Sequence, residues 1–270
     1  MDNEYKDILL HCLQEYSSIG LSDQIDYSKF NLYSLITHST AIEGSTVTEL
    51  ENQLLFDEGL TAKRRNIHEH MMNLDLKNAY DYCLEIKDQH IALTLDFLKA
   101  LAAMVMKNTG SVYKTAQGNF SSAAGDLRLV NVTAGTSGRS YMHYQKVPQK
   151  LQEFCVQFNQ RRQDNLDVVQ AYEMSFDAHF ELVTIHPWAD GNGRMARLLM
   201  HFLQFEQNLV PVNIKKEQKD EYINALINTR ANKDLNIFRR YMFSLHIHNL
   251  QQEITTFRHD LETDFSEYIS

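Results

Sequence analysis

Proline is scarce in this chain, and that scarcity favours a helical fold. The three prolines, Pro148, Pro187 and Pro211, leave long stretches without the residue that most strongly interrupts a helix. Within these stretches apolar residues recur three and four positions apart, the spacing that places them on one helix face. We therefore predict a mostly α-helical protein, with helices near 61–86, 91–106, 148–163, 167–185, 195–207, 215–229 and 234–260.

Glycine is concentrated in one segment that breaks this helical pattern. Five of the ten glycines fall between residues 110 and 138, mixed with serine, threonine and asparagine. Inside the segment, Leu127, Leu129 and 130–132 suggest short extended strands. We predict a β-hairpin or flap within about 110–147.

Composition excludes several classes of protein. A net charge of −9 disfavours binding to DNA or RNA, whose phosphate backbones are negative. With 43% hydrophobic residues, the chain contains no uninterrupted apolar run of membrane-spanning length. The polar segment Met1–Lys6 does not resemble the start of a signal peptide, and Cys12, Cys83 and Cys155 are scattered singly, without disulfide or metal-site spacing. We expect a cytoplasmic protein with no membrane or nucleic-acid partner.

The densest cluster of chemical function lies at residues 186–197, directly before an apolar helical stretch. Gly191 and Gly193 are able to adopt backbone conformations closed to other residues, and so to turn successive N–H groups toward one phosphate. The following helix adds the positive end of its dipole. The segment therefore suits an anion such as the phosphates of ATP.

The charged residues of the cluster fit the same ligand. Asp190 is a carboxylate suited to Mg²⁺ that bridges phosphate oxygens, and Arg194 and Arg197 are three apart on one helix face, where both could grip phosphates. An imidazole at the mouth of such a site, here His186, could accept the proton of an incoming hydroxyl.

The sequence HPWADGNGRMAR at 186–197 resembles the signature of Fic-domain proteins of the Fic/DOC family. The segment GDLRLVNV at 125–132 resembles the flap of the same family. The resemblance implies the Fic fold, a helical bundle with a small β-hairpin flap beside the active-site loop. It also implies an enzyme that transfers AMP from ATP to a hydroxyl side chain of a target protein docked by the flap.

The family resemblance assigns a role to each residue of the loop. His186 becomes the general base and Asp190 the Mg²⁺ ligand. Gly191, Asn192 and Gly193 become the phosphate-binding loop, and Arg194 and Arg197 the phosphate clamps. Trp188 stands where phenylalanine is commonest in the family, and we expect it to anchor the loop in the core.

A second resemblance lies upstream, at residues 39–44. Ser39, Glu43 and Gly44 match the inhibitory-helix motif found in many Fic proteins, in the class that carries it before the core. Gly44 is a natural helix terminator, so Glu43 would lie in the last turn, where a carboxylate opposes the helix dipole. The resemblance supplies Arg197 as its cationic partner, and implies that ATP then binds unproductively. As an alternative to inhibition, Glu43 could position a water molecule that removes AMP from a modified target.

These assignments predict three parts of the chain. Residues 1–75 form a helical segment that includes the inhibitory helix at about 29–44, residues 76–232 form the Fic core, and residues 233–270 form a C-terminal helix that packs on the core or contributes to a homodimer. Other donors, AMP removal, and a non-catalytic regulator that binds nucleotide or a partner protein are alternative functions. The target protein and its modified residue are not predicted.

Overall fold

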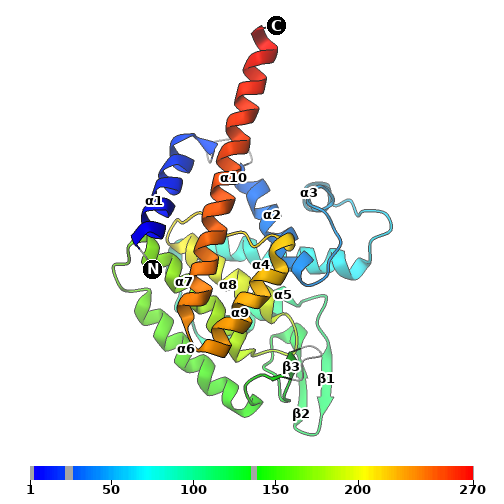
Figure 1. Ribbon diagram of the computed structural model, residues 1–270. Coiled ribbons are helices and arrows are strands. Elements are labelled where there is room, and N and C mark those ends of the chain that lie inside the picture. The colour runs from blue at the N-terminus through cyan, green and yellow to red at the C-terminus, as the bar shows by residue number, and fades with distance from the viewer. Residues whose placement is uncertain (1–2, 22–26, 135–138, 270) are drawn as a thin grey trace. The chain divides into compact units, whose positions relative to one another are not determined.

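The computed structural model describes residues 3–21, 27–134 and 139–269 of the 270-residue chain. Helices dominate this part of the chain, which confirms the mostly α fold class (Figure 1). In chain order they are α1 (Asn3–Ser18), α2 (Tyr27–Ile42), α3 (Glu49–Glu58), α4 (Ile67–Ile86), α5 (Leu95–Val105), α6 (Val147–Arg161), α7 (Val168–Ile185), α8 (Asn192–Glu206), α9 (Lys219–Asn232) and α10 (Leu235–Ile269).

The chain divides into two compact units. One comprises Ile36–Pro211, and the other combines Met1–Leu35 with Val212–Ser270. Residues 36–75, predicted as part of the N-terminal segment, fall in the same unit as most of the predicted core. Residues 212–232, predicted as part of the core, fall in the unit that contains the two chain ends. Every predicted site residue, from Ser39 to Arg197, lies in the Ile36–Pro211 unit.

The centre of the Ile36–Pro211 unit is formed by α7 and α8, which pack against each other, as Figure 1 shows. Helix α6 packs on α7, while α4 and α5 pack on α8. All side chains of α8 from Arg194 to Gln204 are buried, which confirms the prediction that this helix is central. The loop between α7 and α8 is therefore held at both ends by core helices.

Local sequence explains where α7 and α8 begin. The Asp167 side chain accepts a hydrogen bond from the N–H of Gln170, and the Gln170 side chain accepts one from the N–H of Asp167, each at 2.9 Å. This reciprocal pairing satisfies donors that the first turn of a helix leaves unpaired. Helix α8 begins at Asn192, earlier than the predicted Met195, because Gly191 supplies the left-handed turn before it. Its first turn therefore includes Gly193 and Arg194.

The predicted flap consists of two short antiparallel pairs. Strands β1 (Val112–Thr115) and β2 (Gly118–Ser121) form a hairpin, and β3 (Thr133–Ala134) pairs with β4 (Arg139–Ser140). Residues 135–138 of the predicted flap lie outside the described residues.

The prediction of short strands over Leu127–Val132 is wrong. The backbone of this segment makes hydrogen bonds outside any strand pair. The N–H of Arg128 donates to Pro187 O at 3.0 Å, and Val130 O accepts from the Arg128 guanidinium at 2.8 Å. The segment therefore forms no strand, and its hydrogen bonds connect the flap to the loop after α7.

In the other unit, α10 packs against α1 and α9. Phe238, Met242 and Leu245 on α10 are buried, and the Phe238 and Tyr222 rings lie 6.4 Å apart between centroids. This apolar face is therefore used within the chain. No helix in the described residues combines the length and apolar character that crossing a bilayer requires.

Candidate active site

His186 occupies a turn that directs the chain out of α7. Its φ of +52° lies in the left-handed region, and its N–H donates to Leu182 O at 3.0 Å. Few residues other than glycine adopt this conformation, and those that do are concentrated at functional sites. Pro187 follows, which prevents α7 from continuing. The turn presents the imidazole at the start of the predicted loop.

Arg128 of the flap fixes the backbone at this turn. Its side chain is only 1% exposed, and its Nε donates to His186 O at 2.8 Å. The same guanidinium donates to Val130 O and to Met142 O. Burial lowers the pKa of Arg128. Sequence analysis did not assign Arg128 a role, although it is the one charged residue within the run LRLVNV.

We expect Arg128→Ala to lower the free energy of unfolding by at least about 3 kcal/mol, because it removes three hydrogen bonds and a hydrogen bond to a charged group contributes about 1.5–3 kcal/mol. Urea unfolding followed by the fluorescence of the single tryptophan, Trp188, measures this, and Trp188 lies in the loop that Arg128 holds. The exposed Lys63→Ala is the control and should leave the unfolding midpoint unchanged. An equal midpoint for both variants would show that Arg128 does not support the loop.

The imidazole of His186 stacks on the ring of Tyr141, with centroids 3.7 Å apart and planes 13° from parallel. Tyr141 directly follows β4, and its N–H donates to Val132 O at 3.0 Å. A residue of the flap segment therefore helps to orient His186. The sequence contained no signal for this contact, because the two residues meet only in the folded chain.

Trp188 and Asn192 give the loop its shape. Trp188 is buried and its Nε1 donates to Gly125 O at 3.1 Å, which confirms that it anchors the loop in the core. The Asn192 side chain accepts from the N–H of Trp188 at 3.1 Å and donates to Trp188 O at 2.9 Å. The side-chain amide of Asn192 is therefore occupied by the Trp188 backbone. The prediction that Asn192 binds phosphate now concerns its backbone N–H.

The two glycines of the loop are required for different reasons. Gly191 has a φ of +78°, and a Cβ there would lie 2.6 Å from Met106 Sδ. Gly193 lies in the first turn of α8 without a left-handed φ, so the expectation of a special conformation is wrong for this residue. A Cβ on Gly193 would instead overlap Glu43 Oε1. A side chain at 193 would therefore displace the Glu43 carboxylate from its present position.

Arg194 is a cation held inside the protein. Its side chain is 4% exposed, and its terminal nitrogens contact Met106 Sδ at 3.1 Å and Val105 O at 3.5 Å. Its ion pair with Asp190 spans 3.9 Å. Among the described residues its Nε has no hydrogen-bond partner, and burial lowers the pKa of the guanidinium. A buried cation with such weak compensation is suited to receive an anionic ligand.

Asp190 fits the predicted role of a magnesium ligand. Its Oδ1 accepts from the N–H of Gly191 at 2.6 Å, and 60% of its side chain is exposed. In the described part of the chain no group of three or more His, Cys, Asp or Glu side chains could form a complete metal cage. Mg²⁺ in nucleotide sites commonly uses one or two carboxylates and completes its coordination with phosphates and water. A single exposed carboxylate beside the buried guanidinium of Arg194 matches that requirement.

Arg197 is held by the end of α2. Its Nε donates to Ser39 Oγ at 2.8 Å, and its NH2 donates to Ser39 O at 2.9 Å and to Glu43 Oε1 at 2.6 Å. Arg197 is buried, whereas 35% of the Glu43 side chain is exposed. The structure therefore contains the predicted ion pair between Glu43 and Arg197. Helix α2 ends at Ile42, so Glu43, which was expected in its last turn, lies just beyond it, and Gly44 turns the chain with a φ of +106°.

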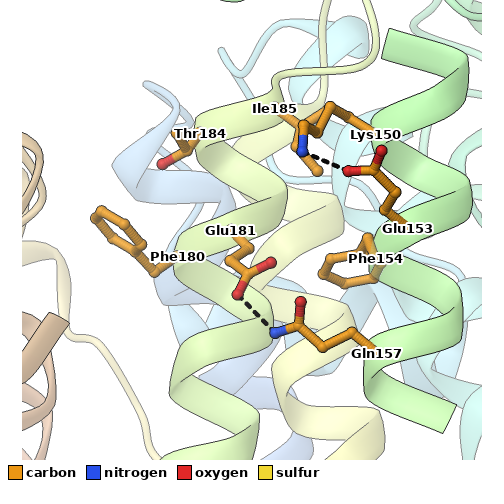
Figure 2. Close-up of a pocket in the computed structure, with 8 residues that line it drawn as sticks. All are labelled: Lys150, Glu153, Phe154, Gln157, Phe180, Glu181, Thr184 and Ile185. Carbon is orange, nitrogen blue, oxygen red and sulfur yellow. Dashed lines mark hydrogen bonds and ion pairs between the residues drawn. The ribbon is translucent and has the colours of Figure 1, made fainter. Parts of the chain in front are cut away.

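A separate groove lies between α6 and α7, with a volume of about 190 Å³. Figure 2 shows its lining and the hydrogen bond from Gln157 Nε2 to Glu181 Oε1, which spans 2.9 Å. Burial raises the pKa of Glu181. The predicted site residues do not line this groove, so it is distinct from the loop at 186–197.

Comparison with known proteins finds a family match that includes the loop at 186–197. The Fic/DOC family model matches residues 92–204. Protein adenylyltransferase fic-1 of Caenorhabditis elegans is 26% identical over 209 residues, which cover 77% of this chain and 38% of that protein. Protein adenylyltransferase Fic of Drosophila grimshawi is 28% identical over 199 residues, covering 71% and 36%. The chain therefore spans little more than a third of the length of these relatives.

Solved structures share the fold. A Fic-domain-containing signalling protein from Bacteroides thetaiotaomicron superimposes with a TM-score of 0.74 at 20% identity, covering 92% of this chain and 95% of that one. A fragment of Fic-1 from Caenorhabditis elegans gives a TM-score of 0.70 at 22% identity, covering 96% and 74%. Over residues 92–204 the chain therefore matches the Fic/DOC family model, and it shares its fold with solved Fic-domain structures.

Proposed function

We propose that this chain is a protein adenylyltransferase, which transfers AMP from ATP to a hydroxyl side chain of a target protein. The buried guanidinium of Arg194 carries the proposal, because it lies at the start of α8 beside an exposed carboxylate and a glycine turn. A polyphosphate would place further negative charge beside this cation, whose ion pair with Asp190 spans 3.9 Å. The names of the relatives, protein adenylyltransferases, support ATP as the donor.

In the proposed reaction, the hydroxyl oxygen of the target attacks the α-phosphorus of ATP. The bond from that phosphorus to the bridging oxygen breaks, pyrophosphate leaves, and His186 accepts the hydroxyl proton. Arg194 and the N–H groups at the start of α8 hold the phosphates and stabilise charge in the transition state. Mg²⁺, when bound at Asp190 and the phosphates, would neutralise part of the charge on the leaving group.

We also propose that Glu43 inhibits this reaction. Arg197 is the second phosphate clamp of the predicted loop, and its NH2 donates to Glu43 at 2.6 Å. While Glu43 holds this group, the terminal phosphates of ATP lose a cationic partner, so that ATP binds unproductively. The carboxylate would also repel a phosphate placed against Gly193.

The target protein is proposed to dock on the flap. The hairpin of β1 and β2 is two-stranded in the described residues, so each strand has an edge that an extended peptide could extend by strand addition. Such docking is proposed to bring an acceptor hydroxyl near His186, whose ring contacts Tyr141 after β4, the last strand of the second flap pair. A cytoplasmic location and a homodimer stay predictions.

Two radiolabels identify the group transferred. The Glu43→Gly protein, incubated with Mg²⁺ and a heat-treated cell lysate whose own kinases are inactive, is expected to place label on protein from ATP labelled at the α-phosphate and none from ATP labelled at the γ-phosphate. Chelation of Mg²⁺ should abolish incorporation. Label from the γ-phosphate would instead establish phosphate transfer. ATP binding without transfer from either position would favour a non-catalytic regulator, and loss of label from a modified target would favour AMP removal.

A further inference from the structure

A buried polar cluster holds the residues on both sides of Glu43. Thr40, three residues before Glu43, places its hydroxyl 2.7 Å from Asn73 Oδ1. Ser45, two residues after Glu43, accepts at Oγ from Asn73 Nδ2 at 3.2 Å. Asn73 lies on α4, so one side chain from a neighbouring helix contacts both the last turn of α2 and the segment that follows it.

Asn52 of α3 completes this cluster. Its Nδ2 donates to Asn73 Oδ1 at 2.9 Å and to Thr37 Oγ1 at 2.7 Å. Asn73 Nδ2 also donates to Glu69 O at 2.8 Å, so the Asn73 amide makes four hydrogen bonds, the full capacity of such a group. Asn52 and Asn73 are both 0% exposed. We call Thr37, Thr40, Ser45, Asn52 and Asn73 the amide cluster.

The position of Glu43 requires such support. Its carboxylate lies at the C-terminal end of α2, where the helix dipole is unfavourable to negative charge. Gly44 then turns the chain with a φ of +106°, and the N–H of Ser45 donates back to Thr40 O at 3.1 Å. The amide cluster fixes both ends of this turn, so the backbone that carries Glu43 has few alternative positions.

We propose that Asn73 is a positioning residue for inhibition: through the amide cluster it keeps Glu43 within reach of Arg197. This inference rests on the proposed function, since it concerns the regulation of that same site. Weakening the amide cluster lets the end of α2 move away from α8, which frees Arg197 for phosphate. Loss of these buried hydrogen bonds therefore increases the rate of AMP transfer.

The test measures incorporation from α-labelled ATP by Thr40→Val and Asn73→Leu. Thr40→Val keeps the shape of the side chain almost constant but removes the hydroxyl, which lies 2.7 Å from Asn73 Oδ1 and 3.0 Å from Thr37 O. It should raise the rate about twofold to tenfold, the shift expected for one neutral hydrogen bond. Asn73→Leu, which removes all four, should raise it further. In the Glu43→Gly background neither substitution should change the rate by more than about twofold, because the carboxylate they position is absent.

A matched control separates regulation from general destabilisation. Asn159→Leu removes an amide that bonds Leu93 N and Leu93 O at 2.8 and 2.7 Å, far in sequence from the inhibitory segment, and should not raise the rate. If Glu43→Gly raises transfer while Thr40→Val and Asn73→Leu do not, the role of the amide cluster is refuted and the proposed function stands. If Glu43→Gly itself gives no increase, the proposed inhibition has failed, and the inference with it.

Discussion

His186→Ala in the Glu43→Gly background is expected to lower the rate of AMP transfer about 10²- to 10⁴-fold, the usual contribution of a positioned general base. The imidazole lies at a left-handed turn whose carbonyl is bound by Arg128, and its ring stacks on Tyr141. Alanine removes the proton acceptor and leaves the phosphate-binding residues of α8 in place. The turnover rate should therefore fall while the affinity for ATP changes little.

Initial rates with α-labelled ATP, together with a titration of ATP binding to each variant, measure this effect. The exposed His248→Ala is the matched control and should transfer at the parental rate. If His186→Ala retained more than about a tenth of the parental rate, a general base worth at least 10²-fold would be excluded at this position. Loss of ATP binding in the same variant would assign the imidazole to the nucleotide site.

Glu43→Gly is expected to raise the rate of transfer about 10- to 100-fold over the unsubstituted chain, because a hydrogen bond to a charged group contributes about 1.5–3 kcal/mol. The substitution removes the Glu43 Oε1 acceptor, 2.6 Å from Arg197 NH2, and leaves the hydrogen bond from NH2 to Ser39 O. It also removes the carboxylate that lies where a Cβ of Gly193 would be. Both changes admit a phosphate to the start of α8.

Two further variants define the cause of this gain. Glu43→Gln keeps the length of the side chain but loses its charge, and should give a smaller increase than Glu43→Gly. Arg197→Ala should cancel most of the gain, since it removes the clamp that Glu43→Gly releases. The exposed Glu58→Gly, at the end of α3, controls for adding a glycine near a helix terminus and should have no effect. Equal rates for Glu43→Gly and the unsubstituted chain would refute inhibition by Glu43.

The helices and the loop at 186–197 were predictable because their signals are local. Apolar spacing identified α6 and α7 nearly to their ends, and the break near Lys87 appears as a short 3₁₀ helix, Lys87–Gln89. The strands expected over Leu127–Val132 were not formed, since Arg128 bonds this segment to the loop after α7. The pattern of apolar residues in a segment does not reveal that a residue far away in the chain will take up its backbone hydrogen bonds.

The residues that hold the site in place were less accessible to sequence analysis. Tyr141 and Asn73 carry no motif, and each acquires its role from a partner on another element. Gly193 was correctly selected, but for the wrong reason. Its conformation is helical, and a side chain there would displace the Glu43 carboxylate.

The sequence by itself determined the helical fold class and the chemistry of residues 186–197, because helical periodicity and a contiguous signature depend on near neighbours. The tertiary structure decided which groups meet: Arg128 with the turn at His186, Glu43 with Arg197, and Asn73 with both sides of Glu43. These contacts join residues far apart in the chain. Their distances and burial depend on how helices pack, which no local pattern specifies.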